Sequence, residues 1–129
     1  MDIREIITLT WPQASAKMLE LGYTQGTPQR SPFYATQTIV PWQRVETVVF
    51  LTVQENYCVS VSVYQPYANH IREWVESSTT VVPDAKLQPS PGTETEVRED
   101  SGYWYSIRKN EDIYNVTVTK KDFIPPLRD

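Results

Sequence analysis

The chain has few of the residues that build most catalytic and metal sites. It contains one histidine (His70), one cysteine (Cys58) and four glycines in 129 residues. A structural zinc site needs about four Cys or His ligands, more than this chain can supply. Phosphate-binding loops need several glycines at fixed spacing, and Gly22 and Gly26 lack that spacing. These shortages exclude many enzyme classes, and we expect neither a metal nor a cofactor.

Long apolar runs and a basic leader are also missing. The longest apolar runs, such as residues 48–51, are far shorter than the roughly 18 residues of a membrane span. The first five residues carry two acids, unlike the basic start of a signal peptide. A single cysteine cannot close an intrachain disulfide, which favours a reducing compartment. We therefore expect a cytoplasmic protein with no membrane partner.

The chain has fewer basic residues than acidic residues. Twelve Lys and Arg stand against sixteen Asp and Glu, giving a net charge of -4. Affinity for nucleic acid depends on Lys and Arg neutralising phosphates, so we expect no nucleic-acid partner. A net negative charge instead accelerates encounter with a cationic protein, and we expect a basic protein partner.

What the chain does have fits one folded domain over residues 1–129. Its length allows an independent core, and it is rich in proline (ten) and in aromatic residues (four Trp, eight Tyr, three Phe). Residues 79–92 contain three prolines and Gly92, which indicates a long loop. We expect residues 120–129 to form a C-terminal arm.

Two helices are predicted. Thr10 and Gln13 fit a capping box, and Gly22 fits a left-handed C-terminal cap, so a helix is expected over 11–21 after a short turn or helix over 3–9. Its core stripe recurs at spacings of three and four: Trp11, Ala14, Met18 and Leu21. A second, shorter helix over 68–77 places three apolar residues on one side: Ile71, Trp74 and Val75.

Five to six strands are predicted: 33–40 ended by Pro41, a hairpin of 45–53 and 57–64, an edge strand over 93–98, and a hairpin of 103–107 and 113–119. The order α-β-β-β-α-β-β-β predicts an α+β fold, a two-layer domain with both helices packed on a mainly antiparallel sheet.

Cross-strand register predicts which face of each hairpin is buried. If Val53 faces Tyr57 across a three-residue loop, then Val49 faces Val61 on the core face. The opposite face then sets Phe50 beside Ser60. In the last hairpin, pairing Ile107 with Tyr114 leaves Trp104 on the outer face.

The favoured function is non-covalent protein binding, as an inhibitor, immunity or adaptor (chaperone) type of protein. An aromatic and acidic surface would carry it: Trp104, Phe50, Tyr64, Glu94 and Glu96. The tail over 123–127 covering Trp104 is an equal alternative for that residue, and a homodimer stays open.

Two other functions remain. One is small-molecule binding in a pocket between helix and sheet, with polar groups from Cys58, Ser60 and Ser62. The other is an enzyme that uses carboxylates, or Cys58 as a nucleophile beside His70.

Overall fold

The computed structural model describes residues 3–31, 35–45, 47–83, 96–109 and 113–121. A 3-10 helix over Ile3–Glu5 precedes two α-helices, Trp11–Glu20 (α1) and Tyr67–Ser78 (α2). Nine strands accompany them: Thr24–Gln25 (β1), Gln29–Arg30 (β2), Gln37–Arg44 (β3), Thr47–Gln54 (β4), Tyr57–Val63 (β5), Thr80–Val81 (β6), Glu96–Glu99 (β7), Tyr103–Lys109 (β8) and Tyr114–Lys120 (β9). The predicted α+β class is confirmed, with more strands than the five to six expected.

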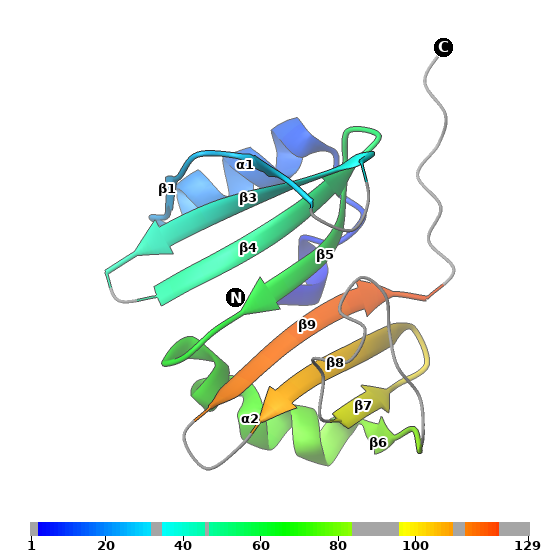
Figure 1. Ribbon diagram of the computed structural model, residues 1–129. Coiled ribbons are helices and arrows are strands. Elements are labelled where there is room, and N and C mark those ends of the chain that lie inside the picture. The colour runs from blue at the N-terminus through cyan, green and yellow to red at the C-terminus, as the bar shows by residue number, and fades with distance from the viewer. Residues whose placement is uncertain (1–2, 32–34, 46, 84–95, 110–112, 122–129) are drawn as a thin grey trace.

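The two halves of the chain repeat one arrangement. All strands join a single antiparallel sheet in the order β1-β3-β4-β5-β9-β8-β7-β6, with β2 beside β3 (Figure 1). In chain order, the first half is a helix, two short strands and three longer strands, and the second half is a helix, one short strand and three longer strands. The halves meet where β5 pairs with β9, and Ser60 faces Thr119 and Ser62 faces Thr117 there. The sheet therefore has an approximate twofold axis between β5 and β9.

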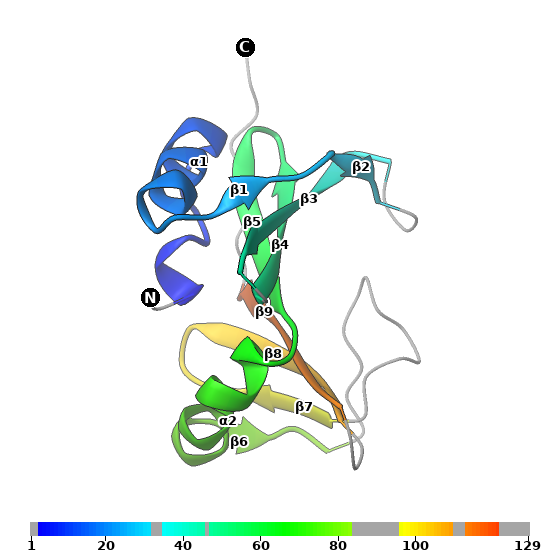
Figure 2. The same cartoon turned by 90° about the vertical axis from the view of Figure 1, so that its left-hand side faces the viewer.

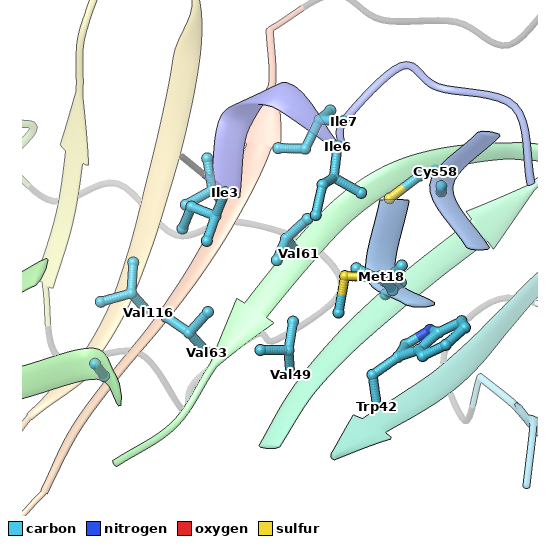
Figure 3. Packing of buried hydrophobic residues seen from close by; sticks show 14 of the residues in the cluster. Ile3, Ile6, Ile7, Met18, Trp42, Val49, Cys58, Val61, Val63 and Val116 are labelled. Atoms are coloured by element: carbon cyan, nitrogen blue, oxygen red, sulfur yellow. The ribbon is translucent and has the colours of Figure 1, made fainter. Parts of the chain in front are cut away.

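Both helices lie on the same side of this sheet, and the N-terminal segment lies between them (Figure 2). One hydrophobic cluster joins α1, through Ala14 and Met18, to α2, through Ala68 and Val75. Its centre is built from Val61, Val63 and Val116 of the strands and from the isoleucines of the first segment (Figure 3). This continuous core makes the chain one domain.

The predicted helices and their caps are confirmed. The Thr10 hydroxyl accepts from the Gln13 backbone N–H at 3.4 Å, and the Gln13 side chain accepts from the Thr10 N–H at 3.1 Å. Gly22 has φ +89°, the left-handed conformation that suits glycine after a helix. The expected inward stripes of both helices are buried or packed against the core. The short helix before α1 covers Ile3–Glu5 rather than 3–9.

Strand β3 does not end at Pro41 as expected, but continues to Arg44. The Pro41 carbonyl accepts from the Gly26 N–H at 2.7 Å, so the polar groups of Pro41 point away from β4. The missing proline N–H therefore costs no bond to β4. The position of the missing N–H lies between β1 and β2, which pair with β3 on either side of Pro41. The first residues predicted for this strand, 33–34, lie outside the described residues.

Gly26 makes this close approach possible. A Cβ at Gly26 would lie 2.8 Å from Cγ of Pro41, whose ring cannot move aside. We expect Gly26→Ala to lower the free energy of unfolding by about 2 kcal/mol, through overpacking. Urea denaturation of Gly26→Ala measures this loss of stability. Gly102→Ala is the control, because a Cβ at Gly102 would make only an ordinary van der Waals contact. Equal stability of the two variants would contradict the expectation.

The first hairpin differs from its predicted register. Thr52 pairs with Ser60 and Val49 with Val63, because the loop has two residues, Glu55 and Asn56, rather than three. Their φ values of 52° and 67° fit a type I′ turn. A β-bulge after Thr52 turns Cys58 to the core side. Tyr57, predicted to face Val53 on the core side, pairs with Gln54 instead. The strand residues beyond the bulge keep their predicted faces, because the shorter loop and the bulge together shift the register by two residues.

The last hairpin and the strand before it also depart from expectation. Ile107 faces Val116 rather than Tyr114, again a slip of two residues that keeps the predicted faces. Strand β7 is not the edge, because β6 pairs with Arg98 and Glu99. Strand β6 lies within the predicted loop of 79–92, of which residues 84–92 are outside the described residues. Of the expected arm, Lys120 belongs to β9, and 122–129 also lie outside the described ranges.

Candidate functional site

The sheet face opposite the helices carries small hydroxyl side chains at its centre. Two neighbouring cross-strand rows place six of them on β4, β5, β9 and β8: Thr52, Ser60, Ser62, Ser106, Thr117 and Thr119. Ser62 and Thr117 hydrogen-bond to each other across the centre, with their oxygens 2.8 Å apart. Thr52, Ser60 and Ser106 are buried, and Ser62, Thr117 and Thr119 are half-buried. We call this side of the sheet, on which neither α1 nor α2 packs, the open face.

Aromatic side chains flank the hydroxyl rows at two opposite corners. Phe50 lies at the β4 end, and its ring meets Tyr64 edge to face with centroids 5.2 Å apart. Tyr64 is 41% exposed. Trp104 lies at the β8 end in the same row as Thr119. With strands about 4.8 Å apart, the two corners are roughly 15 Å from each other.

The approximate twofold axis relates these two corners. It places Phe50 at the position equivalent to Trp104, and Thr52 at the position equivalent to Ser106. Ser60 and Ser62 correspond in the same way to Thr117 and Thr119. Equivalent positions thus keep their chemical class, although the two halves lack an evident sequence repeat.

Trp104 is held by its neighbours. The Lys121 ammonium lies 4.4 Å from the centre of the Trp104 ring. The same ammonium donates to the Asp100 carbonyl at 2.8 Å and pairs with Glu99 at 3.3 Å. The ring is therefore preorganised, which lowers the entropy cost of using it as a binding anchor.

Glu96 does not share a face with Trp104. Glu96 is the cross-strand partner of Ile107, which in turn faces Val116, and this row lies on the helix side of the sheet. There the Glu96 carboxylate forms ion pairs with Lys109 at 2.9 Å and Arg98 at 3.3 Å. The other predicted acid, Glu94, lies outside the described residues. Of the predicted surface, the structure brings Phe50 and Tyr64 into contact and puts Trp104 on the same face.

Cys58 and His70 do not form a reactive pair. Cys58 is fully buried beside the first segment, where its thiol donates to the Ser60 carbonyl. Burial raises the pKa of the thiol to about 12, so it stays protonated at neutral pH. His70 is on the exposed side of α2. The pocket predicted from Cys58, Ser60 and Ser62 is also wrong, because the bulge separates Cys58 from the two serines.

A pocket does exist between helix and sheet, at another place. It has a volume of about 310 Å³ and lies at the start of α1, beside β3 and the β4–β5 turn. Its lining residues are Trp11, Gln25, Pro28, Thr38, Val40, Val53 and Asn56. The sequence contained no signal for it, since these residues come from four separate stretches of the chain: 11, 25–28, 38–40 and 53–56.

No family model, curated protein or solved structure matches the chain. In the part of the chain that the structure describes, no group of three or more His, Cys, Asp or Glu is placed to hold a metal ion. No helix among those residues is long and apolar enough to cross a membrane.

Proposed function

We propose that the protein is a non-enzymatic binding module, of the inhibitor, immunity or adaptor type, that holds a partner protein against its open face. The observation that carries this proposal is the packing of both helices on one side of a nine-stranded sheet. The other side carries Phe50 and Trp104 at opposite corners of the two hydroxyl rows. Binding hot spots are enriched in Trp and Tyr, and truncating such an aromatic anchor at an interface often costs about 2 kcal/mol or more.

The partner's charge is proposed from the whole chain rather than from this face. A net charge of -4 favours a basic partner. Next to Trp104, however, the Glu99 carboxylate is already paired with Lys121. We therefore assign affinity to the aromatic corners, and the net charge to the rate and salt dependence of encounter.

The proposal is tested by affinity capture from the native host, followed by calorimetric titration of the purified partner. We expect Trp104→Ala to weaken binding about 30-fold, since a hot-spot aromatic contributes roughly 2 kcal/mol. Phe50→Ala should weaken it less, because Phe50 also packs on Tyr64. Binding should also weaken as salt is raised.

Leu19→Ala is the matched control, because Leu19 is 61% exposed on α1, which lies on the helix side. It should leave the affinity unchanged, and circular dichroism checks that all variants fold. A partner that binds Trp104→Ala, Phe50→Ala and wild type equally would show that the open face is not the binding surface.

A further inference from the structure

The pocket at the start of α1 lies on the helix side of the sheet, away from the open face. Its floor is formed by Val40 of β3 and Val53 of β4, and one wall is the indole of Trp11. Trp11 is itself supported by Trp42, with ring centroids 6.1 Å apart. The volume of about 310 Å³ is at the lower end of the range for small-molecule sites.

The lining combines an apolar floor with uncharged polar groups. Gln25, Thr38 and Asn56 contribute two carboxamides and one hydroxyl. Within the described ranges, the side chains of these three residues have no hydrogen-bond partner. No charged side chain is among the lining residues in the described part of the chain. A ligand would therefore meet free donors and acceptors but no opposite charge, which penalises an ionised ligand that must leave water.

The other half of the molecule shows that the fold does not require this pocket. Through the approximate twofold axis, Thr38 and Val40 correspond to Glu96 and Arg98. There the two side chains pair with each other, and Arg98 reaches the end of α2. The same strand positions are thus filled by an ionic network in one half and border an open pocket in the other.

We propose that this pocket binds a small, neutral, planar aromatic molecule that carries a carboxamide-type donor and acceptor edge. The aromatic ring lies against Trp11 over the valine floor, and the polar edge hydrogen-bonds with Asn56, Thr38 or Gln25. Neutrality follows from the uncharged lining, and small size follows from the volume. Because the pocket and the open face are on opposite sides of the sheet, this site is independent of the proposed protein partner.

Benzamide is a suitable probe, with benzoate and benzamidinium as matched charged analogues. Titration into ¹⁵N-labelled protein should shift the Trp11 indole N–H and the Thr38 and Asn56 amides, with a Kd of about 1–10 mM for so small a molecule. Each charged analogue should bind at least about tenfold more weakly. Equal binding of all three probes, or no shift of these signals with benzamide, would overturn the proposal.

Two variants locate the site without removing core residues. Thr38→Tyr fills the pocket from an exposed strand position and should weaken benzamide binding more than tenfold. Asn56→Gly removes the carboxamide while tolerating the φ of 67°, and should weaken binding about fivefold. Gln43→Tyr is the control, because it adds the same ring to β3 on the opposite face. Benzamide binding that survives Thr38→Tyr would place the site elsewhere and overturn the proposal.

Discussion

Replacing Arg98 with alanine is expected to lower the free energy of unfolding by about 3 kcal/mol, the largest effect of any single substitution proposed for this protein. The Arg98 side chain is only 12% exposed. Its guanidinium donates to the backbone carbonyls of Glu76 and Thr79 at 3.0 and 2.9 Å, and to the Thr79 hydroxyl at 2.8 Å. The last carbonyls of a helix have no partner within the helix, so Arg98 satisfies groups at the end of α2.

The cost of the substitution comes from the partners left behind. Without Arg98, the carbonyls at the end of α2 lose their donors, and Glu96 keeps only the ammonium of Lys109. Lysine cannot reproduce the planar fork, so Arg98→Lys should lose about half as much stability. Urea denaturation at pH 7 measures both variants, with Arg108→Ala as control for an exposed arginine on β8. A loss for Arg98→Ala as small as that of the control would contradict this account of α2.

Asp100→Ala is expected to lower the free energy of unfolding by about 2–3 kcal/mol, from the loss of several hydrogen bonds to one carboxylate. One carboxylate oxygen accepts from the N–H groups of Gly102 and Tyr103, each at 2.9 Å. The other accepts from the Tyr105 hydroxyl at 2.5 Å and pairs with Arg4 at 3.5 Å. Asp100 thereby fixes the β7–β8 turn and ties it to the first segment of the chain.

The same contacts determine how stability depends on pH. Burial acts to raise the pKa of Asp100, but the hydrogen bonds and the Arg4 charge outweigh it and hold the pKa below its ordinary value of 3.8. The unfolded chain therefore binds this proton more readily than the folded protein does. The contribution of Asp100 is complete above the ordinary pKa and is lost as pH falls below about 4.

Acid titration of unfolding distinguishes this effect from general charge repulsion. Asp100→Asn keeps an acceptor for the turn but cannot titrate, so its stability should fall less steeply between about pH 4 and pH 2 than that of wild type. Glu20→Gln, which removes an exposed acid from α1, is the control for the loss of one carboxylate. Parallel curves for wild type and Asp100→Asn would show that this carboxylate does not carry the acid sensitivity.

Local patterns predicted the helices and the buried faces of both hairpins. The capping box and Gly22 act within a few residues of α1, so no distant contact is needed to place its ends. Face assignments survived a register error of two residues because side chains alternate with a period of two. Between the turn and the bulge after Thr52 the register is shifted by only one residue, which reversed the predicted faces of Tyr57 and Cys58.

Local sequence patterns could not predict the contacts between segments that are distant in the chain. Strands β1, β2 and β6 have two residues each, too few for any periodicity, and they exist because longer strands offer them an edge. Pro41 continues β3 only because its missing donor faces the gap at Gly26. The sequence predicts Glu96 on the same surface as Trp104, yet the β7–β8 register turns it to the helix side.

Local sequence patterns were enough to predict the α+β class, the positions of the helices and the apolar faces of the two hairpins, because these depend on turn chemistry and on periods of 3.6 and 2 residues. The pairing of β5 with β9 is a long-range contact that appears only in the folded structure, and it brings the two halves around one axis. The same pairing assembles the hydroxyl rows from β4, β5, β8 and β9, while packing of α1 against the first half borders the pocket at Trp11. Both candidate sites are made of residues that are far apart in the chain, so no local sequence pattern could predict them.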